Sequence, residues 1–334
     1  MKARYYKKTF HFKRPSGTSR GILTEKHAWF IEIWDESSPD TIGRGECSII
    51  PGLSPDFESF EKYEAQLEDL CEDLNLDLTE WPSLKFGLEC ALLDLENGGK
   101  NIIFDNEFTR GEKSILINGL VWMGDRDFML EQIHKKIEAG FSTIKMKIGA
   151  IDFGSELELL KIIRDFSESL TLRVDANGAF APSDALAKLN ALADLSIHSI
   201  EQPIKAGQWE SMRELCSLTP LDIALDEELI GINNSQKKTE LLETIKPQFI
   251  ILKPSLLGGI SGTKEWISLA EERKIPWWMT SALESNIGLN AICQLTAEYR
   301  NDLPQGLGTG SLYTDNIPSN LLVQNGSISL GNDN

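Results

Sequence analysis

The segment TIKMKI, residues 143–148, is a short apolar strand that carries two lysines, and similar segments follow it along the chain. Five later strands end in polar motifs: VDANG (174–178), IEQP (200–203), LDEEL (225–229), LKPS (252–255) and TSALES (280–285). The ionisable residues of the six segments are Lys147, Asp175, Glu201, Asp226, Lys253 and Glu284, at intervals of 28, 26, 25, 27 and 31 positions. Each interval fits one strand, one helix and their loops, so the pattern predicts that the six groups meet at one rim of a parallel sheet.

Strands and helices are expected to alternate from about residue 115 to residue 310. The expected strands are 115–121, 143–148, 171–175, 198–201, 222–226, 248–253, 276–280 and 304–308. The helices expected between them are 127–139, 155–168, 183–193, 208–217, 235–244, 261–273 and 286–299. This order predicts an α/β fold with a parallel barrel, and an open doubly wound sheet is the alternative.

The first 110 or so residues show a different, α+β pattern. Alternating aromatic and β-branched residues predict three strands within residues 1–50, and helical spacing follows at 56–76 and 81–97. Loops rich in Gly, Pro and Ser are expected at about 15–21 (PSGTSRG) and 49–56 (IIPGLSPD).

Composition and missing motifs exclude several classes of function. The chain has 33 Lys and Arg against 51 Asp and Glu, a formal net charge of −18, which argues against nucleic-acid binding and against docking on an anionic membrane. No apolar run reaches the ~20 residues of a membrane span, and the first residues lack the apolar core of a signal peptide. The five cysteines are widely spaced, as expected of a cytoplasmic protein without disulfides. The absence of P-loop, G-x-G-x-x-G and G-x-S-x-G motifs leaves nucleotide, hydride and serine-hydrolase chemistry without support.

Three acids follow adjacent expected strands: Asp175, Glu201 and Asp226. Each acid taken singly could merely cap the next helix, but their common phase favours a shared site. Oxygen ligands from neighbouring strands suit a hard cation, so we expect one Mg²⁺ here, for which Mn²⁺ could substitute. Asp226 is the preferred third ligand because it is in phase with its strand, and Glu227 is the alternative.

The lysines are expected on opposite sides of this cation. Lys147 and Lys253 end the second and sixth strands, which face each other across an eight-stranded barrel. Lys145 shares a strand face with Lys147, and two close ammonium groups are expected to lower each other's pKa. A lysine base beside a cation can remove a proton α to a carboxylate, so the pattern predicts proton abstraction from a small anionic carboxylate substrate.

At these residues the chain resembles the enolase superfamily, in its muconate-lactonising-enzyme-like branch. KMK, DAN, EQP, LDE and LKP match the ordered motifs of that superfamily. The resemblance implies a modified TIM barrel, (β/α)7β, over 111–310, an N-terminal α+β capping domain over 1–110, and a segment 311–334 that returns to the cap. By the same resemblance, Asp175, Glu201 and Asp226 would bind Mg²⁺, Lys147 would transfer the proton, and Lys253 would stabilise the intermediate from the opposite face.

Three further segments resemble those of one reaction class within the branch: GECSIIPGLSPD (45–56), SALESNIG (281–288) and QGLGTGSLY (305–313). Such enzymes dehydrate 2-succinyl-6-hydroxy-2,4-cyclohexadiene-1-carboxylate to o-succinylbenzoate, through an enediolate, in menaquinone biosynthesis. N-succinylamino acid racemases and dipeptide epimerases use the same lysine pair and remain alternatives, although the Asp-x-Asp of the epimerases is missing here. A non-catalytic barrel that only binds a ligand is a remote alternative, because none of the five key residues is lost.

The expected substrate contacts are Arg173, Asn177, Arg20, Ser281, Ser285 and Gly308. The superfamily resemblance makes the 15–21 loop a lid over the active site. Residues 1–26 hold eight basic residues and one acid, and Arg14 and Arg20 lie in or beside that loop. A cationic lid would favour capture of an anionic substrate.

Overall fold

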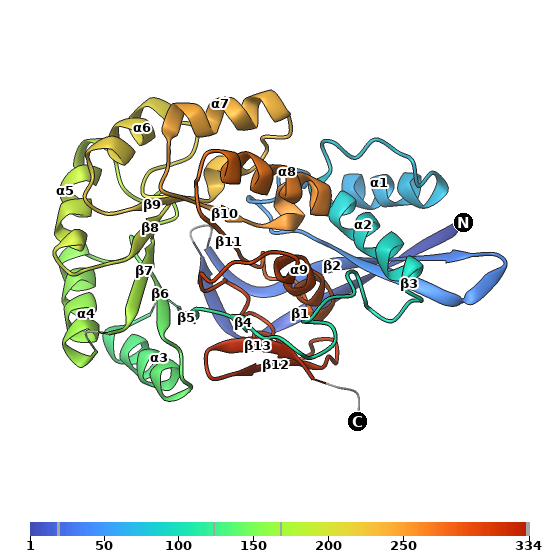
Figure 1. The fold of residues 1–334 in the computed structure, drawn as a ribbon, viewed down its shortest axis with the longest axis horizontal. Helices are drawn as coiled ribbons and strands as arrows, with labels where there is room; N and C mark the ends of the chain where they lie inside the picture. Colours follow the sequence, from blue (N-terminus) through green and yellow to red (C-terminus); the bar gives the residue numbers. More distant parts are fainter. Residues whose placement is uncertain (19–20, 123, 168, 332–334) are drawn as a thin grey trace.

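A long antiparallel sheet forms the N-terminal part of the computed structural model, which describes residues 1–18, 21–122, 124–167 and 169–331. Its strands, in spatial order, are β1 (Lys2–Thr18), β2 (Gly21–Asp35) and β3 (Ser38–Ser48). Helices α1 (Phe60–Glu72) and α2 (Pro82–Glu96) pack against it. Figure 1 shows this unit projecting from one side of the molecule, beside the barrel formed by the rest of the chain.

Glycines in β3 allow its backbone to lie directly against the backbone of α2. A Cβ on Gly45 would lie 1.8 Å from the carbonyl oxygen of Gly87, and a Cβ on Gly43 would lie 2.0 Å from that of Ala91. Such distances exclude every larger residue. Beside this contact, Trp29 and Tyr63 are fully buried in the core of the sheet and its helices. The cap is therefore a packed unit with a core of its own.

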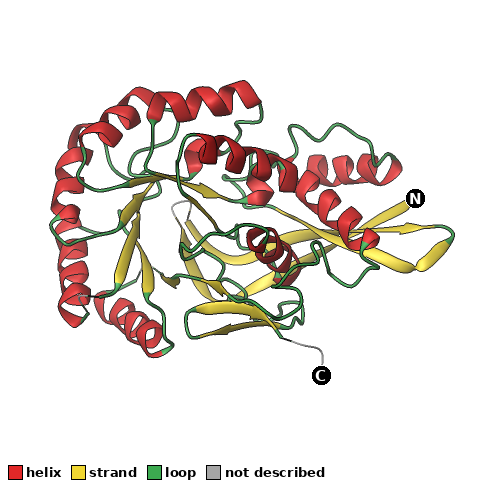
Figure 2. Ribbon diagram, in the orientation of Figure 1, coloured by secondary structure: helices red, strands yellow, loops and turns green. Residues whose placement is uncertain are grey.

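The strands of the barrel run parallel and are hydrogen-bonded in sequence order. They are β5 (Gly119–Val121), β6 (Thr143–Lys147), β7 (Thr171–Asp175), β8 (Ser199–Glu201), β9 (Ile223–Leu225), β10 (Phe249–Leu252) and β11 (Trp277–Met279). The helices that follow them are α3 (Arg126–Glu138), α4 (Phe153–Phe166), α5 (Pro182–Ala193), α6 (Trp209–Leu218), α7 (Ser235–Ile245), α8 (Gly259–Glu272) and α9 (Asn286–Ala297). Short 3₁₀ turns, η1 (Glu227–Leu229) and η2 (Pro254–Leu256), follow β9 and β10. Figure 2 shows the helices forming an outer layer around the strands.

An eighth strand position closes the barrel. Parallel bridges join Gln305 to Ile117 and Gly306 to Thr280, so residues 305–306 connect the first barrel strand to the seventh. Polar groups stabilise this closure, since the Gln305 side chain accepts a hydrogen bond of 2.7 Å from the backbone N–H of Met279. The expected (β/α)7β barrel with an N-terminal capping domain is thus confirmed, and the doubly wound sheet is excluded.

Alternation of side chains along each strand builds two apolar layers. Residues such as Ile144, Val174 and Leu252 face outward and join the large core beneath the helices. The intervening positions face inward, where a smaller cluster contains Ala224, Phe249, Ile251, Trp278 and the partly buried Leu303. The barrel centre is therefore filled below the rim, and ligands can enter only at its open end.

Several expected elements differ in detail. The strand expected at 115–121 divides into β4 (Ile115–Leu116) and β5, because β4 pairs with the C-terminal hairpin. The strand expected at 304–308 is reduced to the two closing bridges. In the loop expected at 15–21, the backbone is strand up to Thr18 and again from Gly21, and Ser19 and Arg20 lie outside the described residues.

The C-terminal segment meets the rest of the molecule at two places. Near its start, Tyr313 bridges to Phe12 of β1 and packs against Phe10. The final hairpin, β12 (Leu321–Gln324) and β13 (Ser327–Leu330), pairs with β4 rather than with the cap. Within the described ranges, no helix is both long enough and apolar enough to cross a membrane.

The 49–56 loop is tied to the capping domain through Asp56. Its carboxylate accepts hydrogen bonds of 2.8 Å and 2.6 Å from the backbone N–H and the hydroxyl of Ser83, in the first turn of α2. Burial raises the pKa of the Asp56 carboxyl to about 6 in spite of these hydrogen bonds. Between about pH 4 and pH 6, the Asp56 carboxyl therefore keeps a proton in the folded chain that it has already released in the unfolded chain.

Replacing Asp56→Asn should change how stability depends on pH. A raised carboxyl pKa means that the folded state binds more protons between about pH 4 and pH 6, so the free energy of unfolding falls as pH rises through that window. Because the amide does not titrate, the wild type should lose on the order of 2 kcal/mol more than the variant between pH 4 and pH 7. Urea titrations at both pH values measure this, and parallel losses in the two proteins would show that Asp56 does not titrate there.

Candidate active site

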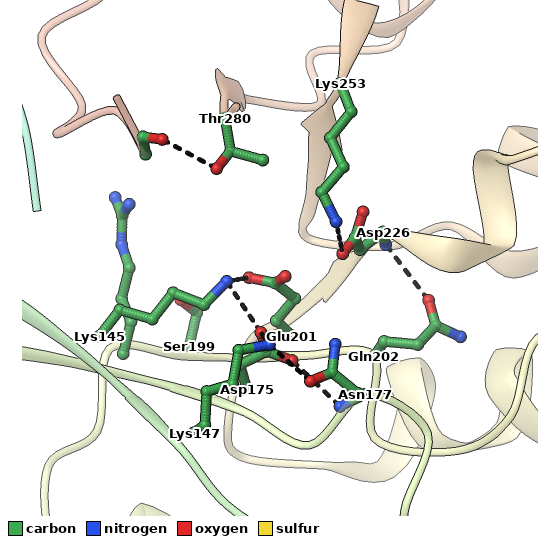
Figure 3. Close-up of polar contacts among 12 residues, drawn as sticks. Lys145, Lys147, Asp175, Asn177, Ser199, Glu201, Gln202, Asp226, Lys253 and Thr280 are labelled. Carbon is green, nitrogen blue, oxygen red and sulfur yellow. Dashed lines mark hydrogen bonds and ion pairs between the residues drawn. The ribbon is translucent and has the colours of Figure 1, made fainter. Parts of the chain in front are cut away.

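Strand register brings the charged motifs to one level of the barrel rim. Lys147 on β6 pairs with Asp175 on β7, and Asp175 pairs with Glu201 on β8. Asp226 follows β9 and Lys253 follows β10, so both enter the same rim from the next strands. Figure 3 shows Lys253 approaching the carboxylates from the side opposite to the two lysines of β6.

Ion pairs join these side chains into one buried cluster. The ammonium of Lys145 contacts Glu201 and lies 2.9 Å from Asp175 Oδ2. The same oxygen lies 3.0 Å from Lys147 Nζ, while Lys253 pairs with Asp226. The side chains of Asp175, Glu201 and Asp226 are buried, and those of the three lysines are only 12–14% exposed. Counted as fully ionised, these three acids and three lysines carry no net charge.

Asn177, just after β7, connects Lys147 on β6 to Glu227, which follows β9. Its side-chain oxygen accepts a 2.7 Å hydrogen bond from Lys147 Nζ, and its amide nitrogen donates to Glu227 Oε1 at 3.0 Å. The left-handed backbone of Asn177, with φ of 44°, turns the chain back so that its own N–H donates to Asp175. The sequence suggested Asn177 as a substrate contact, and in the structure it holds the amine of Lys147.

Gln202 of the EQP motif plays a similar part for Asp226. Its side-chain oxygen accepts hydrogen bonds from the backbone N–H groups of Asp226 and Glu228, at 3.2 Å and 3.3 Å. Its amide nitrogen donates to the carboxylate of Glu228. The turn after β9 is thereby held in place, with Asp226 directed toward Lys253 (Figure 3).

Burial and the neighbouring charges together set the pKa values of the cluster. Burial alone would lower the pKa of Lys145, but Asp175 and Glu201 outweigh it and raise that pKa. Burial opposes ionisation of Asp175 too, yet Lys145 and Lys147 hold its pKa well below the usual range. For Glu201, burial and the charge of Asp175 both raise the pKa. The expectation that neighbouring lysines lower each other's pKa does not hold for Lys145, because it lies among carboxylates.

The donor set suits a hard divalent cation. Three carboxylates come from adjacent strands, and Glu201 Oε1 is buried without a hydrogen-bond partner. In the described part of the chain no three potential ligands already converge on one point, since lysine ammonium groups lie between the acids. Asp226 is held by Lys253, whereas Glu227 lines the pocket beside it.

A pocket opens above the cluster and combines charged and apolar walls. Lys145, Lys147, Asp175, Glu201 and Lys253 form its charged side. Its other walls include Ile50 and Leu53 from the cap, Leu120 in β5, Trp122 just after it, and Gly306, Gly308 and Thr309. Trp278 and the segment Thr280–Leu283, at the end of β11, line it too. Trp122 and Thr309 were not anticipated, because neither belongs to a charged motif. Their only signal in the sequence is a position just after a barrel strand.

The expected substrate contacts fall into different places. Asn177, Ser281 and Gly308 line the pocket. Ser285 instead caps α9 and donates its hydroxyl to Glu46 of the cap. Arg20 lies outside the described residues.

Arg173 lies one layer below the rim, inside the barrel. It is two residues before Asp175 on the same face of β7, so its side chain points inward beneath the acids. The guanidinium stacks over Trp278 at 4.0 Å and donates to the carbonyl of Pro304 at 2.7 Å. These contacts make Arg173 part of the filled barrel interior instead of the pocket wall.

The fold and the site together define a capped barrel with paired lysines facing three carboxylates, and comparison with known families agrees. The family described as enolase C-terminal domain-like matches residues 129–333. The chain therefore belongs to the enolase superfamily.

Among individual relatives, the chain is 47% identical to o-succinylbenzoate synthase of Desulfotalea psychrophila, over 98% of each sequence. The crystal structure of MenC from the same organism matches with a TM-score of 0.88 at 43% identity, covering 98% of this chain and 99% of that one. A dipeptide epimerase from Enterococcus faecalis has the same fold, with a TM-score of 0.86 at 20% identity, covering 99% and 96% of the two chains.

Proposed function

We propose that the protein is an o-succinylbenzoate synthase, a hydro-lyase that removes water from 2-succinyl-6-hydroxy-2,4-cyclohexadiene-1-carboxylate. The near full-length similarity to the Desulfotalea psychrophila synthase supports this class of reaction. The observation that carries the chemistry is the placement of Lys147 and Lys253 on opposite sides of three buried carboxylates (Figure 3). This arrangement suits proton abstraction next to a substrate carboxylate.

Asp175, Glu201 and Asp226 would hold one Mg²⁺, which when bound neutralises negative charge on the substrate carboxylate. The unpartnered oxygen of Glu201 and the all-oxygen donor set support this assignment. Asp226 is proposed as the third ligand and Glu227 as its alternative. Asn177 keeps Glu227 oriented through its amide nitrogen.

Lys147 would move the proton in both halves of the reaction. Its amine takes the α-proton of the substrate, and the C–O bond to the 6-hydroxyl group breaks as the ring becomes aromatic. The same ammonium then returns the proton to the departing hydroxide, so that one water leaves. Asn177 and Asp175 hold Lys147 Nζ at 2.7 Å and 3.0 Å, and a base fixed on one face favours syn elimination.

Lys253 and the cap complete the proposed site. Lys253 contributes a positive charge from the far side and need not exchange a proton in the dehydration. Ile50 and Leu53 extend from the capping domain over the pocket and would exclude water from the reacting carbons. The five cysteines are free thiols, which agrees with the proposed cytoplasmic location.

The opposed lysines also favour one second candidate, racemisation of N-succinylamino acids. In that reaction Lys147 and Lys253 would each exchange a proton with one face of the substrate. A curated N-succinylamino acid racemase of Thermus thermophilus is 33% identical over 48% of this chain.

The substrate assay distinguishes the two functions. Purified protein with Mg²⁺ should convert the cyclohexadiene carboxylate to o-succinylbenzoate, followed by the ultraviolet absorbance of the aromatic product. In deuterium oxide, N-succinylamino acids of either hand should exchange their α-proton far more slowly than dehydration proceeds. Exchange from both enantiomers without dehydration would instead identify a racemase.

Replacing Lys147→Ala should lower kcat for dehydration by roughly 10²- to 10⁴-fold, because the only base proposed on that face is lost. Lys161→Ala on the exposed face of α4 is a matched control and should keep the wild-type rate. Steady-state kinetics of both variants make the comparison. Wild-type turnover in Lys147→Ala would exclude this lysine as the base.

Removal of divalent metal should abolish dehydration, and added Mg²⁺ or Mn²⁺ should restore it. Asp175→Asn should weaken Mn²⁺ binding, measured directly by electron paramagnetic resonance, because a charged oxygen ligand is lost. Asp194→Asn at the exposed end of α5 serves as the control. Full activity after exhaustive chelation would contradict the metal assignment.

A further inference from the structure

Glu284 is a fully buried acid directly behind the pocket wall. One of its oxygens accepts a 2.5 Å hydrogen bond from the hydroxyl of Ser255, and the other accepts a 2.7 Å hydrogen bond from the hydroxyl of Ser281. The side chain thus links the turns that follow two neighbouring strands, β10 and β11. A carboxylate is well suited to this link because each oxygen can accept independently.

Both serines belong to chain segments that form the proposed site. Ser255 lies in η2, two residues after Lys253. The hydrogen bond from its hydroxyl to Glu284 therefore lies close to the backbone of that lysine. Ser281 begins the stretch Ser281–Leu283, which lines the pocket. The bond to Glu284 therefore couples the position of Lys253 to that of the pocket wall.

A second buried acid joins this link to the capping domain. Glu46 on β3 accepts hydrogen bonds from the backbone N–H and the hydroxyl of Ser285, at 2.9 Å and 2.6 Å, and from the N–H of Gly288 at 2.9 Å. These donors lie at the start of α9, where a negative charge is favoured. Figure 1 shows α9 beside the cap sheet.

The two acids are close neighbours across the domain contact. A Cβ on Gly288 would lie 2.8 Å from the Cβ of Glu284 and 3.0 Å from Glu46 Oε2, so this glycine leaves room for both side chains. Lys26 of β2 is buried beside them, where its charge attracts both carboxylates, and it donates to the hydroxyl of Ser48. Each acid thus accepts hydrogen bonds from buried donors, which offsets part of the cost of taking a carboxyl group out of water.

We propose that Glu284 is a positioning residue for the reaction: it holds the Lys253 turn and the Ser281–Leu283 wall in one arrangement, and Glu46 anchors that arrangement to the capping domain. The inference rests on the proposed function, because it assumes that Lys253 acts on the substrate. Glu284 itself touches neither the pocket nor the acids proposed to bind metal. Its effect on catalysis passes through Ser255 and Ser281.

Kinetics of Glu284→Gln and Ser255→Ala test the proposal. Each variant should lower kcat by roughly tenfold or more, because a small displacement of Lys253 weakens charge stabilisation during the reaction. KM should stay within about threefold of the wild type, and Mn²⁺ affinity should fall far less than in Asp175→Asn, because none of the proposed metal ligands is replaced. Ser255→Ala removes a single hydroxyl, so it provides a readout even if Glu284→Gln fails to fold.

Two matched controls separate positioning from a general loss of stability. Asp94→Asn alters another buried acid, which accepts backbone hydrogen bonds within the cap, and Ser268→Ala removes a hydroxyl on the exposed side of α8. Asp94→Asn should lower the melting temperature without lowering kcat, and Ser268→Ala should change neither. If Glu284→Gln and Ser255→Ala melt earlier but keep the wild-type kcat, Glu284 is only structural and the proposal is wrong.

A double-mutant cycle measures the link without any substrate. Glu284→Ala and Ser255→Ala should destabilise the chain less together than the sum of their separate effects, because each removes one partner of the same hydrogen bond. Additive effects would show that the bond is not formed and would overturn the proposal. A wild type that forms no o-succinylbenzoate but shows coupling in this cycle would overturn the proposed function, and with it the role of Glu284 in that reaction.

Discussion

The structure depends on keeping several charges buried together at one rim of the barrel. Asp175, Glu201 and Asp226 would repel each other there, and isolated burial would drive them to take up protons. Lys145, Lys147 and Lys253 lie among their oxygens and oppose this repulsion. The two lysines of β6 hold the pKa of Asp175 low, whereas burial and the charge of Asp175 still raise the pKa of Glu201. The geometry of the cluster is tight because each ammonium group pairs with specific carboxylate oxygens.

Parallel strand register makes such a cluster possible. Lys147, Asp175 and Glu201 stand level because β6, β7 and β8 are paired without offset at their carboxyl ends. Neutral side chains in the turns after the strands then orient these charged groups. Asn177 holds Lys147, and Gln202 holds the backbone of Asp226. Apolar residues below the rim fill the barrel interior, so the charged groups face the pocket at its open end.

The capping domain contributes shape more than charge. Ile50 and Leu53 reach over the pocket from a loop that Asp56 ties to α2, while Glu46 joins β3 to the start of α9. The glycine contacts between β3 and α2 pack this domain closely beneath that loop. In the proposed reaction, the lysines and carboxylates of the barrel would act on the substrate, and this loop would help to exclude water.

The spacing of KMK, DAN, EQP, LDE and LKP by itself predicted a parallel α/β sheet with these residues at one rim, because a βα repeat returns each strand end to the same edge. It left a doubly wound sheet open, and only the strand order and the bridges of residues 305–306 in the structure decided for the closed barrel. The spacing of the motifs did not determine which other residues contact the substrate or hold the cap on the barrel. Arg173 has the charge of a substrate contact, yet the alternation of β7 directs it beneath the rim against Trp278. Ser285 and Glu46 lie 239 positions apart, and Trp122 and Thr309 lie at opposite ends of the barrel sequence. Only tertiary packing brings such residues together, because their contacts depend on how the cap lies on the barrel and on which way each turn leaves its strand.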